Sequence, residues 1–355
     1  MSSQITVGLS GGVDSAVAAY LLKARGLPVT GVFMKNWDDA DPLCSAESDY
    51  ADVAAVSALL GIPYYSVNFE REYQERVFAS FLRDYRAGRT PNPDVLCNSE
   101  IKFAAFLDFA LDSGSDQIAT GHYARTASDG STTLLLKGKD QSKDQSYFLC
   151  LLNQQQLSRA LFPLGGLLKS EVRAIARELA LPVAAKKDST GICFIGERNF
   201  KAFLMQYFPQ RPGPIRTLEE GTQIGQHDGL LYYTLGQRRG LGIGGQTGAG
   251  DGRWFVVGKE TDTNTLLVSQ SEEALYAPAL YLDGLHFIAG DPQESFDCHA
   301  KIRYRQPDQR AQVTKETAGW RVSFAEPQRA VCPGQYCVLY DGEVCLGGGT
   351  IREAA

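Results

Sequence analysis

Hydrophobic and polar positions follow two different periods over the first 200 residues. Apolar runs rich in β-branched residues predict buried strands, over residues 5–9, 28–37, 63–69 and 117–124. Apolar residues at helical spacing predict the intervening helices, over residues 16–23, 49–61, 99–114 and 169–182. This alternation is typical of an α/β protein with a doubly wound parallel sheet, which binds ligands at the carboxyl ends of its strands.

The pattern changes after Phe208, where prolines, glycines and short strand-like runs replace the helices. From about residue 271 the runs are all β, and Asp341-Gly342 between two of them predicts a hairpin. We expect a small β-barrel there, since closure removes exposed strand edges. The predicted domains are residues 1–200, a linker domain over 201–270, and the barrel over 271–355.

Composition narrows the class of protein. The sequence has no run of about 18 apolar residues, so no membrane span is predicted. The N-terminus has neither the charged n-region nor the apolar h-region of a signal peptide. We therefore expect a cytoplasmic protein without a membrane partner. The eight cysteines form no C-x-x-C pair, which argues against a metal or iron–sulfur site. A disulfide scaffold is also unexpected in that compartment, so any special cysteine should be catalytic or redox-active.

The net charge of −6 argues against a non-specific nucleic-acid binder but leaves room for local basic patches. Four clusters of basic residues are candidates for such patches: Lys137 with Lys139 and Lys143, Lys186 with Lys187, Arg238 with Arg239, and Lys301 with Arg303 and Arg305. Each cluster is equally well interpreted as a solvated face.

The turn Ser10–Ser15 lies between the first predicted strand and the first predicted helix. Its backbone N–H groups and the positive end of the helix dipole suit a phosphate, and Gly11 and Gly12 permit close approach. The turn has neither the lysine of a Walker loop nor the spacing of a dinucleotide fingerprint. An ordinary glycine-rich turn is the alternative, which the agreement of strand, loop and helix disfavours. Met34 and Gly121 fall at the ends of two further predicted strands.

Two cysteines stand in stretches that suit chemistry. Around Cys97, prolines keep the chain extended, and Asn98 or Ser99 is expected to cap a helix, so that the dipole lowers the thiol pKa. Asp94 is placed to hydrogen-bond a substrate or relay a proton. Cys193 lies between glycines in a predicted loop. For each cysteine, a small buried hydrophobe is the alternative.

The sequence SGGVDS resembles the signature of the PP-loop ATP pyrophosphatases, which cleave ATP between the α- and β-phosphates and adenylate a substrate. Beside such a site, one thiol could carry sulfur as a persulfide and the second release it by forming a disulfide. Eight motifs in order are similar to the bacterial tRNA-specific 2-thiouridylase family over nearly the whole chain. They are GLSGGVDS, NPDVLCN, ATGHYAR, KDQSYFL, STGICFIGER, TLGQRRGLGIGG, KIRYRQ and PGQYCVLYDGEVCLGGG.

This resemblance implies 2-thiolation of the wobble uridine, position 34, in the tRNAs for Lys, Glu and Gln, with ATP and Mg²⁺ as cofactors. Cys97 corresponds to the nucleophile and Cys193 to the persulfide carrier, charged by a cysteine desulfurase or a sulfur-relay protein. The implied ATP-binding residues are Gly8, Leu9, Ser10, Gly11, Gly12, Val13, Asp14, Ser15, Met34 and Gly121. The implied tRNA-binding residues are Asn92, Pro93, Asp94, His122, Lys143, Asp144, Gln145, Arg303, Tyr304 and Gln335.

Other readings are open at this point. A small-molecule synthetase with the same loop would leave both cysteines as packing residues and the barrel unexplained. A 4-thiouridine enzyme should carry an added RNA-binding module, and a 2-thiocytidine enzyme cluster-binding cysteine pairs. A nucleotide-sensing protein would bind ATP without releasing pyrophosphate. Packing is the expected role of Cys332, Cys337 and Cys345, and Cys150 has no assigned role.

Overall fold

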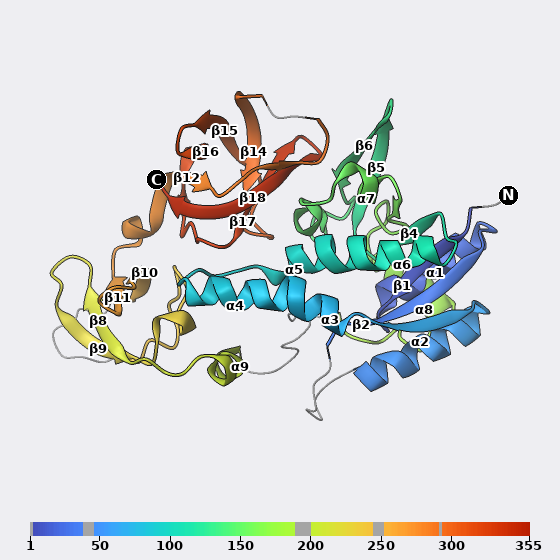
Figure 1. Ribbon diagram of the computed structural model, residues 1–355, viewed down its shortest axis with the longest axis horizontal. Coiled ribbons are helices and arrows are strands. Elements are labelled where there is room, and N and C mark those ends of the chain that lie inside the picture. Colours follow the sequence, from blue (N-terminus) through green and yellow to red (C-terminus); the bar gives the residue numbers. More distant parts are fainter. Residues whose placement is uncertain (1–2, 38–45, 189–199, 244–251, 291–292) are drawn as a thin grey trace.

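The first domain is built on a five-stranded parallel sheet (Figure 1). The structure is a computed structural model that describes residues 3–37, 46–188, 200–243, 252–290 and 293–355. The strand order is β3-β2-β1-β4-β7, so the direction of winding reverses between β1 and β4. This confirms the predicted doubly wound α/β fold. The strands are β1 (Ile5–Leu9), β2 (Val29–Lys35), β3 (Tyr64–Asn68), β4 (Gln117–Ala119) and β7 (Ala160–Leu161).

Helices cover both faces of this sheet, as the strand composition requires. Ile5, Val7 and Leu9 point to one face, where they share a buried cluster with residues of three helices. These helices are α1 (Val13–Ala24), α2 (Ala46–Leu60) and α8 (Lys169–Glu178). Val32 and Ile118 belong to a second cluster on the opposite face, beneath two long helices. The turn Ser10–Ser15, which follows β1, therefore lies at the carboxyl edge of a fully covered sheet.

Each of the two long helices contains a π-helical stretch. The first consists of α3 (Glu70–Tyr73), the π segment Gln74–Phe78 and α4 (Ala79–Arg86). The second consists of α5 (Pro93–Leu96), the π segment Cys97–Ala105 and α6 (Phe106–Asp112). Figure 1 shows both crossing the middle of the molecule, from the parallel sheet towards the β domains. Because π-helical turns are frequent at functional sites, the segment that starts at Cys97 is of particular interest.

Shorter helices and turns lie between these larger elements along the chain. The helices are α7 (Gln154–Leu157) and α9 (Phe200–Tyr207), and the 3₁₀ turns are Ser146–Leu149, Leu230–Tyr232 and Glu272–Leu275. The middle domain has a four-stranded sheet in the order β10-β11-β8-β9. Its strands are β8 (Gly213–Thr217), β9 (Gln223–His227), β10 (Phe255–Glu260) and β11 (Thr265–Ser269).

The C-terminal domain is a closed antiparallel β-barrel, as predicted. Closure comes from β12, which pairs with β16 on one side and with β18 on the other. The hairpin predicted at Asp341-Gly342 joins β17 to β18, with Gly342 at a φ of 56°. The strands are β12 (Tyr276–Leu282), β13 (His286–Phe287), β14 (Ser295–Lys301), β15 (Gln309–Glu316), β16 (Gly319–Arg329), β17 (Tyr336–Asp341) and β18 (Val344–Ala354). Cys332, Cys337 and Cys345 are buried, in agreement with a packing role.

A hairpin of the first domain extends the barrel sheet, which the sequence analysis does not predict. Strands β5 (Ala124–Asp129) and β6 (Thr132–Lys137) pair with each other, and β6 also pairs with β18. At this junction the buried Lys137 ammonium contacts the Asp308 carboxylate and lies 4.4 Å from the centre of the Tyr340 ring. Lys137 is therefore an internal tie between domains and does not belong to an exposed basic patch. None of the described helices is long and apolar enough to cross a lipid bilayer.

Candidate active site

The turn after β1 has the form of an anion-binding loop. Gly12 is the N-cap of α1, and Gly11 has a φ of +70°. A Cβ at Gly11 would lie 2.6 Å from the carbonyl oxygen of Asp49, so only glycine fits. The Ser15 hydroxyl accepts a 3.1 Å hydrogen bond from the Ser10 N–H and donates a 3.2 Å bond to the Gly12 carbonyl. The loop is thus held by its own serines, and the first N–H groups of α1 remain available for a ligand.

The structure brings the two distant residues of the predicted ATP site to this loop. A Cβ at Gly8 would lie 3.0 Å from the Met34 Cε, so the methionine side chain lies directly against β1. A Cβ at Gly121 would lie 2.8 Å from the Ser15 nitrogen and 2.9 Å from the Asp14 carbonyl carbon. The carboxyl edges of β1, β2 and β4 therefore meet around the loop.

Gly121→Ala is expected to weaken ATP binding by about tenfold, because the added methyl group must displace the loop at Ser15 and overpacking costs about 1–3 kcal/mol. Isothermal titration calorimetry with ATP measures the effect. Gly166→Ala is the matched control, since a Cβ at Gly166 meets nothing within 4 Å. Equal affinities of the two variants would show that the Gly121 contact does not shape the nucleotide site.

The helix that carries Cys97 begins earlier than predicted. Its N-cap is Asn92, whose side chain accepts a 3.2 Å hydrogen bond from the Asp94 N–H, and Pro93 is the first helical residue. Proline suits that position because its ring fixes φ and no N–H is needed there. The predicted caps, Asn98 and Ser99, instead donate to backbone carbonyls within the helix.

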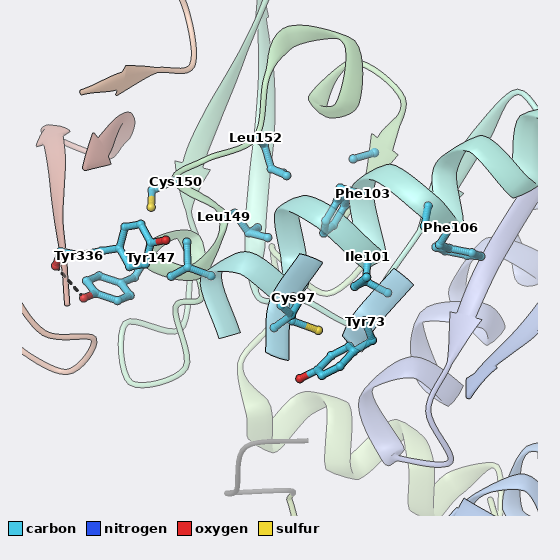
Figure 2. Close-up of a cluster of buried hydrophobic side chains, with 14 of the residues drawn as sticks. Tyr73, Cys97, Ile101, Phe103, Phe106, Tyr147, Leu149, Cys150, Leu152 and Tyr336 are labelled. Atoms are coloured by element: carbon cyan, nitrogen blue, oxygen red, sulfur yellow. Dashed lines mark hydrogen bonds between the residues drawn. The ribbon is translucent and has the colours of Figure 1, made fainter. Parts of the chain in front are cut away.

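Cys97 therefore lies in the body of the helix, at the start of its π segment. The prediction that its thiol faces a helix N-terminus is wrong, and the dipole argument for its pKa no longer applies. Its side chain is only 6% exposed and belongs to the same buried cluster as Tyr73 and Ile101 (Figure 2). A thiol in such surroundings is protected from solvent, and a substrate must reach it within the protein.

Burial shifts the pKa values of Asp94 and His122 in opposite directions. Burial raises the pKa of the Asp94 carboxyl, and the charge of Lys102 lowers it in part. Burial, followed by the charge of Lys102, lowers the pKa of His122 well below 6.5. Its Nδ1 is 2.8 Å from the Thr120 hydroxyl oxygen, so His122 is a neutral, hydrogen-bonded imidazole at pH 7. Lys102, which influences both groups, was not predicted as a site residue.

The predicted tRNA-binding stretch 143–145 makes contacts within the chain. The buried Asp144 carboxylate accepts hydrogen bonds from the N–H of Gly138 at 2.9 Å and from the hydroxyl of Ser146 at 2.9 Å. Gln145 exchanges two hydrogen bonds with the backbone of Tyr123. Asp144 and Gln145 therefore shape the turn beside the Ser10–Ser15 loop, which Tyr123 contacts through Asp14.

Two of the predicted tRNA-binding residues of the barrel, Arg303 and Tyr304, are consecutive and make contacts within the chain. Arg303 donates a 3.0 Å hydrogen bond to the Ala330 carbonyl, and the Tyr304 ring lies 4.4 Å from that of Phe148. Burial raises the pKa of Tyr304 to about 12, so its hydroxyl stays protonated at neutral pH. The contact between Tyr304 and Phe148 ties the barrel to the turn after Gln145, whereas the Arg303 bond lies within the C-terminal domain.

Gln335 supports the segment that leads into the Cys97 helix. Its side-chain amide donates to the carbonyls of Thr90 at 2.7 Å and Pro91 at 3.2 Å, directly before the cap Asn92. The Thr90 N–H in turn donates to the Pro333 carbonyl at 2.9 Å. The barrel therefore holds the entry to the predicted catalytic helix.

Gln335→Met is expected to lower the free energy of unfolding by about 1–3 kcal/mol, because two carbonyls lose their donor while side-chain volume is kept. Urea denaturation followed by circular dichroism measures this change. Gln155→Met, on an exposed residue of α7, is the comparison variant, and we expect it to be nearly neutral. Unchanged stability of Gln335→Met would contradict a supporting role.

An ionic network next to the loop was not predicted. The Lys169 ammonium lies 2.7 Å from an Asp14 oxygen and 2.8 Å from an Asp188 oxygen. Lys143 and Arg173 also contact Asp188, at 2.8 and 2.6 Å. These residues are far apart in the sequence and follow no common spacing, so no sequence pattern indicates the network. Cys193, the predicted persulfide carrier, lies outside the described residues.

The fold and the glycine loop define a nucleotide-binding HUP domain of the PP-loop class, followed by two β domains. Three families match in order: tRNA methyl transferase HUP domain over residues 3–197, tRNA methyl transferase PRC-barrel domain over 201–270, and Aminomethyltransferase beta-barrel domain over 278–351. The solved structure of NMN synthetase from Francisella tularensis covers 57% of this chain and 72% of its own, at 18% identity and a TM-score of 0.35.

Curated relatives are much more similar in sequence than this solved structure. The tRNA-specific 2-thiouridylase MnmA of Streptococcus pyogenes serotype M2 (strain MGAS10270) is 57% identical over 99% of this chain and 95% of its own length. The protein of the same name from Streptococcus sanguinis (strain SK36) has the same identity and coverage. The chain belongs to the tRNA-specific 2-thiouridylase family, which confirms the resemblance drawn from its motifs.

Proposed function

We propose that this protein transfers sulfur to C2 of the wobble uridine, position 34, in the tRNAs for Lys, Glu and Gln, with release of AMP and pyrophosphate. One observation carries the proposal. A chain that is 57% identical to named 2-thiouridylases over 99% of its length also has the glycine-rich turn Ser10–Ser15 and the helix with the buried Cys97 in one domain. In this proposal residues 1–200 form the catalytic domain, 201–270 a tRNA-binding linker domain, and 271–355 the barrel.

ATP binds at the loop in this proposal, with its phosphates on the first N–H groups of α1. Gly8, Met34 and Gly121 shape the site around the loop, as their close contacts suggest. Mg²⁺ bound to a triphosphate needs only one or two carboxylates, and Asp14, 31% exposed in the loop, fits that part. Mg²⁺ would neutralise charge that develops on the phosphates. No group of three or more metal-ligating side chains occurs among the described residues.

The base is activated first. The flipped-out uracil presents its 2-oxo oxygen to the α-phosphate, and the adenylated base forms as pyrophosphate leaves. Asn92, Pro93 and Asp94 meet this base, because they start the helix that carries Cys97. Asp94 is suited to proton transfer, since burial raises its pKa towards the working pH.

Sulfur then replaces the activated oxygen. The terminal sulfur of a Cys193 persulfide attacks C2 and AMP leaves, after which the Cys97 thiolate attacks the Cys193 sulfur and frees the thiolated base. Alternatively, Cys97 attacks first, and the released sulfide attacks C2. Both routes end in a Cys97–Cys193 disulfide, which a thiol reductant must reduce. A cysteine desulfurase or sulfur-relay protein recharges Cys193.

A single reaction tests the proposal. Purified protein, ATP, Mg²⁺, a cysteine desulfurase with cysteine as sulfur donor, a thiol reductant and unmodified tRNA for Lys, Glu or Gln are mixed, and the digested nucleosides are analysed by mass spectrometry. We expect 2-thiouridine at position 34 together with AMP and pyrophosphate. ATP binding without pyrophosphate release would indicate a nucleotide-sensing protein, and adenylation without thiolation would indicate a synthetase.

A further inference from the structure

Three polar side chains form a row along the helix that carries Cys97. Asp94, Asn98 and Lys102 are four residues apart, and this spacing places them on one face of a helix. Asn98 is only 3% exposed, and Asp94 and Lys102 are half-buried. Because buried polar groups normally have hydrogen-bond partners, the partners of this row indicate its role.

The side-chain amide of Asn98 is only half satisfied. Its Nδ2 donates a 3.0 Å hydrogen bond to the Asp94 carbonyl, which can only accept, so the orientation of the amide is fixed. Its Oδ1 is buried and has no hydrogen-bond partner among the described residues. A buried acceptor without a partner lowers stability, so Asn98 Oδ1 is suited to a donor group of a ligand that enters the protein.

Lys102 adds a donor at the next position of the row. Within the part of the chain that the structure describes, its ammonium forms no ion pair. Burial dominates the pKa shifts of Asp94 and His122, and the charge of Lys102 acts on both, so the ammonium lies within electrostatic range of each. The Phe103 ring lies 5.8 Å from the His122 ring. This part of the helix therefore adjoins the strand end that packs against the Ser10–Ser15 loop.

We propose that Asn98 and Lys102 recognise the Watson–Crick edge of the target uracil, with Asn98 Oδ1 accepting from N3–H and the Lys102 ammonium donating to the 4-oxo oxygen. The inference rests on the proposed function, because its ligand is the base that is flipped out for thiolation. The order of the row matches the order of groups on the base, with Asp94 at the end of the 2-oxo oxygen. That oxygen stays free for the α-phosphate, and Cys97 directly precedes Asn98 in the chain.

Cytosine presents the opposite pattern at these two positions. Its N3 is an acceptor and its 4-amino group is a donor, so Asn98 Oδ1 would face a lone pair and the Lys102 ammonium would face another donor. A site that is built to hydrogen-bond one ligand discriminates strongly against a ligand that leaves its buried polar groups unpaired. Two side chains of one helix therefore distinguish U34 from C34.

The test compares two anticodon stem–loop RNAs that differ only in U34 or C34. Fluorescence anisotropy measures their dissociation constants on the full chain, with Mg²⁺ and α,β-methylene-ATP, which cannot release pyrophosphate. We expect the wild-type chain to bind the U34 RNA about a hundredfold more tightly, and Asn98→Leu and Lys102→Met each to reduce this preference about tenfold. Lys102→Arg keeps a donor and should retain most of the preference.

Ser99→Ala is the matched control and should keep the full preference. Ser99 is also buried, and its hydroxyl likewise donates to a carbonyl of the same helix, that of Leu96 at 3.3 Å. A merely structural role of Asn98 or Lys102 would weaken binding of both RNAs equally, and a preference unchanged by either substitution would overturn the inference.

Equal affinity of the wild-type chain for the two RNAs would also overturn it, because the base would then not be recognised at this site. Thermal melting checks that the variants fold, and Lys102→Met, on a half-buried residue, decides the matter if Asn98→Leu does not fold. If the wild-type chain binds neither RNA, the proposed function fails, which is a separate outcome.

Discussion

Cys97→Ser is expected to abolish 2-thiouridine formation while ATP binding stays at the wild-type level. The hydroxyl of serine cannot form the disulfide that frees sulfur from Cys193. Cys97 is in the π segment of the long helix, whereas the phosphate loop is built from the turn between β1 and α1. Mass spectrometry of digested tRNA measures the product, and calorimetry measures ATP binding. Cys193→Ser should give the same pair of results.

A second cysteine provides the control. Cys298 in β14 is 8% exposed, close to the 6% of Cys97, and burial raises its pKa to about 12. Cys298→Ser should therefore carry the same packing penalty without loss of product. Normal 2-thiouridine from Cys97→Ser would rule out the two-thiol mechanism, and loss of product in both variants would point to a folding defect.

Asp94→Asn is expected to lower the thiolation rate by about 10²–10⁴-fold at neutral pH, the usual contribution of a positioned acid or base. If the carboxylate acts as a base, the wild-type rate rises as pH increases through the Asp94 pKa. Burial raises that pKa above the ordinary value of 3.8, and the variant should lack this rise. Single-turnover rates between pH 4.5 and 8 measure the profile.

A measurement of stability distinguishes a loss of catalysis in Asp94→Asn from unfolding of the variant. A raised native pKa means that the folded chain binds more protons than the unfolded chain between pH 3.8 and the native value. Stability is therefore lost as pH rises through that window, and it stays lower at neutral pH. Asn removes this penalty, so Asp94→Asn should be at least as stable as wild type at pH 7. Asp108→Asn, on an exposed residue of α6, is the control for activity.

Local sequence patterns were sufficient to predict the parts of the candidate site that are built from consecutive residues. The loop Ser10–Ser15 could be predicted because strand, glycines and helix are consecutive, and Gly11 does adopt the positive φ that its position requires. The start of the Cys97 helix was predicted wrongly for a local reason. Pro91 and Pro93 suggested an extended chain, but proline is also favoured at the first helical position when a residue such as Asn92 caps the helix.

Contacts between distant segments could not be predicted in the same way. Lys137 in a basic cluster gave no sign of its burial against Asp308, which lies 171 residues further along the chain. Gln335 matched a tRNA-binding position of the family, whereas its observed partners are the carbonyls of Thr90 and Pro91. Such roles depend on the packing of domains, which periodicity along the chain does not encode.

The pairing of β6 with β18 has a consequence for the order in which the protein matures. During synthesis the β5–β6 hairpin leaves the ribosome about 200 residues before its partner strand. Until then one edge of β6 lacks its partner, and Thr90 and Pro91 lack theirs in the barrel. The start of the Cys97 helix therefore receives its final support only when β18 has been made, because the Ile351 N–H of that strand donates to the carbonyl of Gln335.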